Sequence, residues 1–433
     1  MSGLLRVRVN VAAGGTGLDE GVKIVGNIHA TAPGSRGLRS VLFPLGTQAP
    51  PAEFSVEAGG YLVEATLPSG VLLAEQVHVA EGASATVELE APGEPDESRS
   101  LQYVLGNVLP APAPPVRIAP PQEDLPGRYG IPLPSPRTEP PKLVRLRTEA
   151  SSAASYRSLS GLAGLPPADA ASAVRAAMAP AGPPEDPVSA QGDDAVAIYR
   201  VRGGAAPANG PVPSRDFLLV EAAGHRLLAV LPIPWPDARG QDTAAEVVVH
   251  LRPRPAASRV SVTVRDPDLT AGLAYLAAGN LAKAAAVFAA VEGLLYAPGT
   301  PGAVANPLAA VAACYLFLGT GSPGTSAGWT DRVPDLSRQL PLFGDGPILQ
   351  AALRLREATT ARDEEAARQL AKAAFRRGLP AFTLGLSWLV DLLAEFPEDA
   401  GCEAMLAQVR RLAWRAEMRE AFVVLELGGN RDD

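Results

Sequence analysis

Cysteine is almost absent from this chain of 433 residues, which contains only Cys314 and Cys402. Both lie in apolar segments with helical spacing, and two thiols can build neither a disulfide framework nor a four-cysteine zinc site. Histidine is nearly as rare, and no histidine has a cysteine or a carboxylate at metal-ligand spacing. The histidines are His29, His78, His225 and His250. We therefore expect packed, reduced thiols, no metal ion and no cofactor.

Long apolar runs are missing as well. No segment approaches the roughly eighteen consecutive apolar residues of a membrane-spanning helix. The N-terminal stretch MSGLLRVRVNV alternates apolar and polar residues, where a signal peptide would have a continuous apolar core. These absences predict a cytoplasmic protein with no membrane contact.

Positive charge is in deficit. The chain has 38 Lys and Arg residues against 46 Asp and Glu residues, a formal net charge of -8, and no basic block. Binding to a phosphate backbone needs clustered basic side chains, so nucleic acid is not an expected partner. Lysine occurs only at Lys23, Lys142, Lys283 and Lys372, whereas arginine, alanine, glycine and proline are abundant. This composition is typical of a bacterium with a GC-rich genome.

The chain is too long for one ordinary core, and its length favours two or three domains. The first, residues 1–93, begins with LRVRVNV, which alternates strictly and so predicts a half-buried strand over Leu5–Val11. Further alternating segments are separated by Gly, Pro and Ser turns, as expected for a small antiparallel sandwich. These segments are 22–30, 40–45, 60–68, 75–80 and 85–91.

The end of this first region, Tyr61 to Glu90, reads YLVEATLPSGVLLAEQVHVAEGASATVELE. A Gly-Tyr strand feeds a hairpin, and a last Val-rich strand follows a Gly turn. This pattern resembles the carboxypeptidase-regulatory-like, or transthyretin-like, sandwiches. The resemblance implies a non-catalytic accessory domain.

Residues 94–142 are dominated by proline, which removes backbone donors and fixes φ, so we interpret them as a semi-rigid linker. Pro112, Pro115 and Arg117 are arranged as SH3-type grooves accept them, which leaves peptide recognition as an alternative.

A second β-rich region is predicted over 143–265. Its expected strands are 142–147, 195–202, the hairpin 216–234, 245–251 and 259–264.

At Asp266 the apolar period changes from two to three or four, which predicts an α-helical region over 266–433. Asp266 or Asp268 is expected to cap the first helix. In EEAARQLAKAAF the apolar residues form one helical stripe, and Thr360 followed by Asp363 predicts a capped start. Trp414 is expected to pack in the core, with a role as an interface anchor as the alternative.

One helical hairpin in this region, GLAYLAAGNLAKAAAVF, carries Gly272, Tyr275, Gly279, Ala284 and Phe288. Their spacing is that of the tetratricopeptide repeat, in which small residues let two helices close and aromatics fill the space beside them. The hairpin therefore resembles that family. The first large aromatic of the motif is absent, and two further units, at 309–321 and 352–380, are degenerate. A helical bundle without repeat geometry stays open as the alternative.

One segment matches a catalytic motif. GTSAG, residues 324–328, fits the G-x-S-x-G nucleophile elbow, with Ser326 as nucleophile. An elbow needs a strand before it and a helix after it, whereas this segment lies in a predicted loop, and every histidine precedes it. Asp345 is the one nearby acid that could form a Ser-Asp dyad. We therefore expect no catalytic residues and no enzyme, with a serine hydrolase as the alternative.

Together these patterns predict a multidomain all-β plus all-α protein that acts as a non-enzymatic protein–protein adaptor, binding its partner through residues 266–433. The combination of sandwich and helical repeat is similar to bacterial accessory proteins of caspase-like or CHAT peptidases, which implies a role in signalling or defence. A second alternative is carbohydrate or surface binding by the sandwiches, through an exposed platform of Tyr61, Tyr199 and Trp235.

Overall fold

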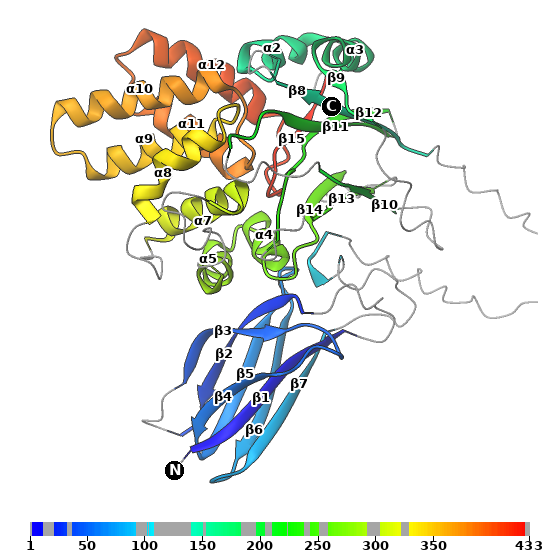
Figure 1. The fold of residues 1–433 in the computed structure, drawn as a ribbon, viewed down its shortest axis with the longest axis vertical. Coiled ribbons are helices and arrows are strands. Elements are labelled where there is room, and N and C mark those ends of the chain that lie inside the picture. The colour runs from blue at the N-terminus through cyan, green and yellow to red at the C-terminus, as the bar shows by residue number, and fades with distance from the viewer. Residues whose placement is uncertain are drawn as a thin grey trace, which may run out of the picture.

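A computed structural model describes most of the chain (Figure 1). The described residues are 2–11, 21–32, 37–91, 102, 104–107, 140–149, 153–182, 196–203, 210–222, 224–237, 243–250, 259–291, 304–321 and 329–428. Small β-sheets come first along the chain and helices follow, as predicted. Most of the proline-rich segment and the GTSAG loop lie outside the described residues. No helix within the described ranges is long and apolar enough to cross a membrane.

The N-terminal sandwich consists of two sheets with strand orders β4-β1-β7 and β3-β2-β5-β6. Alternation places Leu5, Val7 and Val9 in the interior with no exposed surface, as the sequence predicts. The strands pair antiparallel, except that the first strand, β1, pairs parallel with the last strand, β7. The strands are β1 (Ser2–Val11), β2 (Lys23–Ala30), β3 (Leu38–Pro44), β4 (Ala52–Glu57), β5 (Gly59–Thr66), β6 (Leu72–Val79) and β7 (Ser84–Ala91).

The second β-rich region forms a sheet of order β15-β12-β11-β8-β9 and a smaller one of order β10-β13-β14. Its strands are β8 (Lys142–Thr148), β9 (Ala179–Pro180), β10 (Val196–Val201), β11 (Arg215–Ala222), β12 (His225–Val230), β13 (Ala245–His250), β14 (Val260–Val264) and β15 (Val424–Glu426). Two helices, α2 (Tyr156–Gly161) and α3 (Pro167–Ala177), lie between β8 and β9. Every residue of β13 and β14 is buried, so these strands are covered on both faces.

Eight helices lie in the described part of 266–433. They are α4 (Thr270–Ala277), α5 (Leu281–Ala290), α7 (Pro307–Thr320), α8 (Trp329–Gln339), α9 (Asp345–Glu357), α10 (Ala361–Arg377), α11 (Thr383–Ala394) and α12 (Ala400–Ala413). Helix α7 is buried at every residue from Leu308 to Leu318, which makes it the central helix. At α10 the predicted cap is confirmed as a full capping box of Thr360 and Asp363.

The hairpin of α4 and α5 has the close approach expected from its small residues. A Cβ atom added at Gly272 would lie 2.8 Å from Cε2 of Phe288, and Ala284 is fully buried. Gly279 turns the chain with a φ of 74°, and the side chain of Asn280 caps α5 by accepting from the Lys283 amide. The cap predicted for α4 is wrong, because Leu269 is the N-cap. Asp266 accepts from the Asp268 amide in the turn before the helix and from the buried indole of Trp235.

The chain returns to the second β-rich region after its last helix. Residues Val424–Glu426, within the range predicted to be helical, form β15 and pair antiparallel with β12. The apolar run of these residues is too short to form a helix, and it pairs with the free edge of β12. Figure 1 shows this red strand beside the green strands of the second region. We call residues 142–428 the mixed unit, because one sheet contains strands from before and after the helices.

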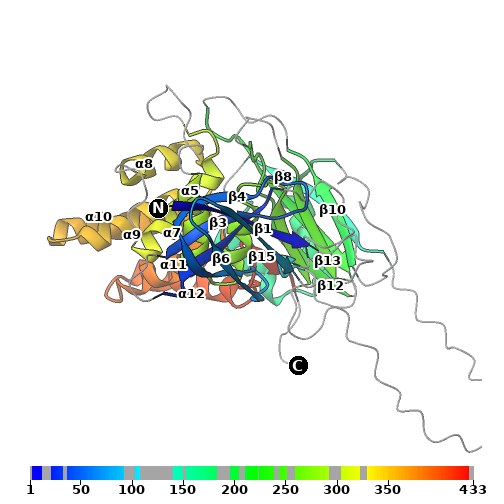
Figure 2. The ribbon, with the colours of Figure 1, turned by 90° about the horizontal axis from the view of Figure 1, so that it is seen from below.

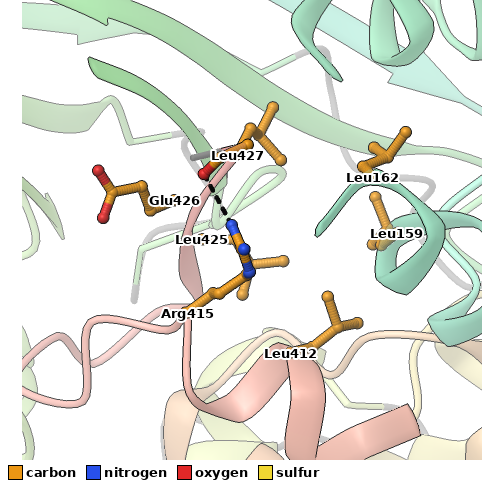
Figure 3. A pocket seen from close by; sticks show the side chains of 8 residues that line it. Leu159, Leu162, Leu412, Arg415, Leu425, Glu426 and Leu427 are labelled. Atoms are coloured by element: carbon orange, nitrogen blue, oxygen red, sulfur yellow. Dashed lines mark hydrogen bonds between the residues drawn. The ribbon is translucent and has the colours of Figure 1, made fainter. Parts of the chain in front are cut away.

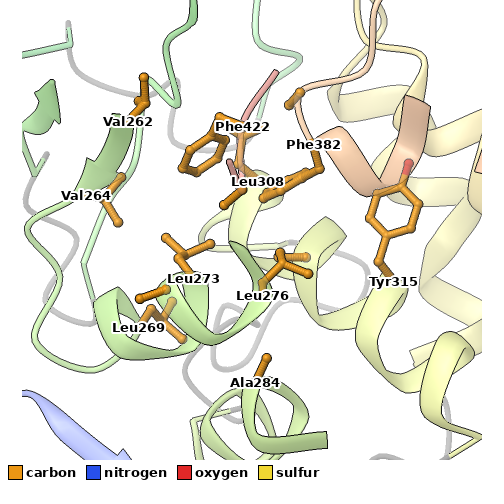
Figure 4. Close-up of a cluster of buried hydrophobic side chains, with 14 of the residues drawn as sticks. Val262, Val264, Leu269, Leu273, Leu276, Ala284, Leu308, Tyr315, Phe382 and Phe422 are labelled. Carbon is orange, nitrogen blue, oxygen red and sulfur yellow. The ribbon is translucent and has the colours of Figure 1, made fainter. Parts of the chain in front are cut away.

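Buried apolar side chains form one continuous cluster from the N-terminal sandwich to β15. Figure 4 shows its centre, where Val262 and Val264 of β14 meet Leu273 of α4, Leu308 of α7 and Phe422. Seen from below in Figure 2, the sandwich lies across the junction between the helices and the second β-rich region.

Three polar contacts hold the sandwich to α4 and to the turn before it. The Tyr275 hydroxyl donates to the Thr66 carbonyl and accepts from the Val25 amide at 3.2 Å, while Lys23 pairs with Asp268 at 2.6 Å. The predicted linker also contributes packing: Val104 is fully buried. Gln102 in the same segment donates to Glu246 of β13. Sandwich and mixed unit are therefore in direct contact.

Candidate functional site

An open groove of about 340 Å³ lies in the helical region. It lies on three alternate helices, α7, α9 and α11, and we call it the α7–α9–α11 groove. Its lining is Leu318, Ala352, Leu355, Arg356, Trp388, Asp391, Leu392 and Glu395.

Helix α9 contacts both α7 and α11, and α11 also contacts α7 through Trp388, while α8 and α10 connect the three helices in sequence. Successive helical hairpins that stack side by side place their first helices on one face, and that face forms the usual binding surface of such arrays. The groove therefore lies where a stacked-hairpin arrangement presents a ligand surface.

One wall of the groove is the indole of Trp388. The ring is partly buried and packs edge-on against Tyr315, with ring centroids 5.2 Å apart and an angle of 87°. A Cβ atom at Gly319 would lie 3.3 Å from Cζ2 of this indole, so the absence of a side chain there lets the ring lie close to α7. Packing on two sides fixes the indole, and a pre-ordered aromatic wall binds a partner with less loss of entropy.

The rim of the groove is acidic on the α11 side. Asp391 and Glu395 are exposed and stand four residues apart on the same face of α11, where like charges repel. The ion pairs found among the described residues do not include either of them. On the opposite side, Arg356 donates to the Leu318 carbonyl at 3.2 Å and so fixes the end of α7. The free acidic pair favours a cationic partner.

A second cavity, between α2, α12 and β15, is much smaller at about 10 Å³ (Figure 3). Leucine side chains surround it, and Arg415 closes one side by donating to the Gly428 carbonyl at 2.7 Å. This volume holds at most about one water molecule, so the cavity is a packing defect and cannot hold a substrate.

The helical region contains a buried carboxyl group with a perturbed pKa, that of Asp345, which has no exposed surface. Its carboxylate accepts from the Ala381 amide at 2.7 Å and the Tyr315 hydroxyl at 3.2 Å. Burial raises the pKa of Asp345 to about 6, although these hydrogen bonds and the charge of Arg215 oppose the rise.

Arg215 of β11 is the buried cation of this cluster. It donates to the carbonyls of Leu342 and Leu379, and its guanidinium lies 4.4 Å from the ring centroid of Phe343. Burial lowers the pKa of Arg215 to about 10, with nearby Asp345 acting in the opposite direction. Perturbed groups often mark active sites, yet neither described cavity is lined by these residues. The cluster joins β11 to α9 and the start of α11.

Residues that the sequence singled out for catalysis are not assembled into a site within the described ranges. Ser326 lies outside those ranges, and both oxygens of Asp345 accept hydrogen bonds from the protein. Among the described residues, no group of three or more His, Cys, Asp or Glu side chains could hold a metal ion. His225 pairs with Glu426 at 2.8 Å, and His250 contacts the Asn107 carbonyl at the same distance.

The aromatic residues considered for carbohydrate binding are buried. Tyr61, Tyr199 and Trp235 have exposed fractions of 2%, 7% and 0%. They do not form an exposed platform. Conversely, the prediction that Trp414 packs in the core is wrong, because 76% of this residue is exposed at the end of α12.

The groove itself was missed from the sequence. Trp388, Asp391 and Glu395 share a helix face, but the closing of α9 against α11 that makes them one surface depends on contacts far apart in sequence. A Trp with two acidic residues at i+3 and i+7 on one helix was the available signal.

In a comparison with known protein families, residues 271–424 match the family described as Y4kD C-terminal domain. The matched segment begins within α4 and ends at the first residue of β15, so it covers the helices from α4 to α12, with β-rich regions before it. No curated protein matches the chain, and no solved structure does either.

Proposed function

We propose that this protein is a non-enzymatic adaptor that binds a protein partner in the α7–α9–α11 groove. The observation that carries the proposal is the groove itself, which combines a fixed Trp388 wall, apolar sides from Leu318 and Leu392, and an acidic rim. Grooves of this kind bind amphipathic segments by accepting apolar anchors and pairing the flanking charge.

The partner is a segment with one or two large apolar side chains and neighbouring basic residues. Apolar anchors suit the volume of about 340 Å³, and basic residues relieve the repulsion between Asp391 and Glu395. Because these carboxylates are exposed, they contribute chiefly to the association rate and to partner choice.

Two resemblances support this proposal. The α4–α5 hairpin has tetratricopeptide spacing, and tetratricopeptide-like arrays bind partners on the face formed by their first helices. We further propose that the partner belongs to a bacterial signalling or defence system with a caspase-like or CHAT peptidase, which is the class that the accessory-protein resemblance implies.

Point variants of the groove test the proposal better than removal of residues 266–433, because that deletion would also remove β15 from the sheet of the mixed unit. Affinity purification from the source cells identifies a candidate partner, which is then purified and titrated calorimetrically. We expect Asp391→Lys with Glu395→Lys (D391K/E395K) to weaken binding at least about tenfold.

The matched control is Glu75→Lys with Glu81→Lys (E75K/E81K), which reverses two exposed charges on the N-terminal sandwich. This control should bind like the wild type. Equal affinity of the wild type and folded D391K/E395K for the partner would contradict the groove as the binding site. Circular dichroism of each variant establishes that it is folded.

A further inference from the structure

One buried side chain connects the Trp388 wall of the groove to the carboxyl group of Asp345. Tyr315 of α7 packs its ring against the Trp388 indole, with ring centroids 5.2 Å apart, and its hydroxyl donates to the Asp345 carboxylate at 3.2 Å. Tyr315 itself has no exposed surface. A groove that opens to solvent is therefore linked to a charge in the protein interior by two successive contacts.

Close packing leaves the Tyr315 ring little freedom. A Cβ atom added at Gly385 would collide with the Tyr315 hydroxyl, so this hydroxyl lies directly against the backbone of α11. Trp388 follows Gly385 by three residues, which places both on the same face of that helix. Phe382, just before α11, also packs on the ring, with centroids 6.2 Å apart. Because close-packed interiors transmit strain, a change at the hydroxyl reaches the indole.

The charge of Asp345 determines the strength of the hydrogen bond from Tyr315. An ionised carboxylate accepts a charge-assisted bond, which is about twice as strong as a bond between neutral groups. Protonation removes the charge and gives the carboxyl group an O–H of its own, so the tyrosine hydroxyl loses its preferred acceptor. Burial raises the pKa of Asp345 to about 6, so both states are populated in mild acid.

Other polar groups also face the Asp345 carboxyl group. They are Arg215 of β11, Tyr156 of α2 and the backbone amides of Ala381 and Phe382 before α11. On the side of α8 and α10, Arg377 donates to the carbonyl and the hydroxyl of Ser337 and not to Asp345. Tyr315 is the member of this set that packs against the Trp388 indole.

We propose that Tyr315 is a positioning residue of the α7–α9–α11 groove and transmits the protonation state of Asp345 to the Trp388 wall. When Asp345 is ionised, the Tyr315 hydroxyl is held and its ring supports the indole edge-on. When Asp345 is protonated, the ring relaxes and the indole shifts, so the groove binds its partner less tightly in mild acid. This inference rests on the proposed role of the groove as a protein-binding site and adds control of that site by pH.

The experiment is fluorine NMR of the full chain labelled with fluorotryptophan, recorded without a partner from pH 5 to pH 8. The chain contains four tryptophans, and Trp388→Phe identifies the Trp388 signal by its loss. In the wild type we expect this signal to shift with pH, with a midpoint at about 6. Tyr315→Phe removes the hydroxyl and keeps the ring, so it should abolish the shift.

Two further variants locate the coupling. Asp345→Asn removes the titrating group and leaves the acidic rim of the groove in place, so it should also abolish the shift. Tyr156→Phe is the matched control, because it removes another fully buried hydroxyl near Asp345 from a ring that stacks on Phe375. This control should keep the shift. A Trp388 signal that stays fixed in the folded wild type, or that moves equally in folded Tyr315→Phe, would overturn the inference.

The two proposals fail separately, since the NMR titration needs no partner. A Trp388 signal independent of pH contradicts the coupling, and the groove is still tested by D391K/E395K. If Trp388 titrates as expected while D391K/E395K binds the purified partner like the wild type, the coupling is supported and the groove is not the binding site. Where both hold, partner affinity should fall between pH 7 and pH 5 more in the wild type than in Tyr315→Phe, and an equal fall in both would contradict control of binding through Tyr315.

Discussion

The N-terminal sandwich and the mixed unit use their strands in different ways. In β5 of the sandwich, buried residues alternate with partly exposed ones, whereas β13 and β14 of the mixed unit are buried throughout. A sheet with one face in water must alternate, and a sheet covered on both faces need not. The strands of the sandwich therefore follow an alternation that is visible in the local sequence, while the fold of the mixed unit depends on contacts between segments distant in sequence.

We expect the largest loss of stability from Phe422, whose side chain packs against segments distant in sequence. Phe422, just before β15, is fully buried and lies 5.0 Å from Phe382 and 6.2 Å from Trp235 between ring centroids. Phe422→Ala should destabilise the mixed unit by about 3 to 5 kcal/mol. Denaturant unfolding followed by tryptophan fluorescence measures this loss.

The matched change in the sandwich is Phe43→Ala, since Phe43 is equally buried. It should destabilise the sandwich and shift the fluorescence transition of the mixed unit less than Phe422→Ala does, because only the contacts between the two parts transmit the loss. Equal effects of both substitutions on one shared transition would show that the two parts unfold together.

The second prediction concerns the pH dependence that Asp345 gives to the mixed unit. Its pKa rises from 3.8 unfolded to about 6 folded, so between these values the folded state binds a proton that the unfolded state has lost. Stability is therefore fully present below pH 3.8 and falls as pH rises through 6, by up to about 3 kcal/mol.

Asp345→Asn removes the titrating carboxyl group. The readout is therefore how the unfolding free energy changes with pH, and not the stability of the variant at one pH. The difference in unfolding free energy between wild type and variant should decline from pH 4 to pH 7, as measured by urea unfolding at a series of pH values. A difference independent of pH would contradict the raised pKa.

A smaller effect is expected where the two parts meet. Tyr275→Phe removes the hydroxyl that bonds Thr66 and Val25, and leaves two backbone groups of the sandwich without this partner. The cost should be about 1 to 3 kcal/mol. Calorimetry should then show the sandwich melting apart from the mixed unit, while Tyr61→Phe, within the sandwich, should not separate the transitions.

The smallest effect belongs to the other contact between the two parts. Lys23 and Asp268 are 2.6 Å apart, but their side chains are 38% and 27% exposed. Lys23→Ala should cost no more than about 1 kcal/mol, and the loss should shrink in high salt. Thermal unfolding at low and high ionic strength tests both statements.

Several elements were predictable because their signals are local. The alternation of Leu5, Val7 and Val9 is enough to predict β1, and Thr360 with Asp363 is enough to predict the start of α10. The prediction that Gly272 lets the two helices of the hairpin close is also consistent with the structure, since a side chain there would collide with Phe288. Each of these signals lies within one element or one hairpin.

Residues whose role depends on a distant partner were predicted less well. Asp266 bonds Trp235 instead of capping α4, and Tyr275 bonds the sandwich in addition to packing in its hairpin. Trp414 is 76% exposed at the end of α12, whereas helical spacing alone placed it in the core. Sequence spacing gives the face of a helix but not what lies opposite it.

The sequence by itself determined the order of β-rich and helical regions, the capped start of α10 and the small residues of the α4–α5 hairpin. Periodicity and turn chemistry act within a few residues, so they can be read along the chain. Only the tertiary structure decided that β15 completes an earlier sheet, that Asp345 and Arg215 are buried together, and that α7, α9 and α11 form a groove. Each of these features depends on contacts between segments far apart in sequence, and patterns within a few neighbouring residues do not specify such contacts.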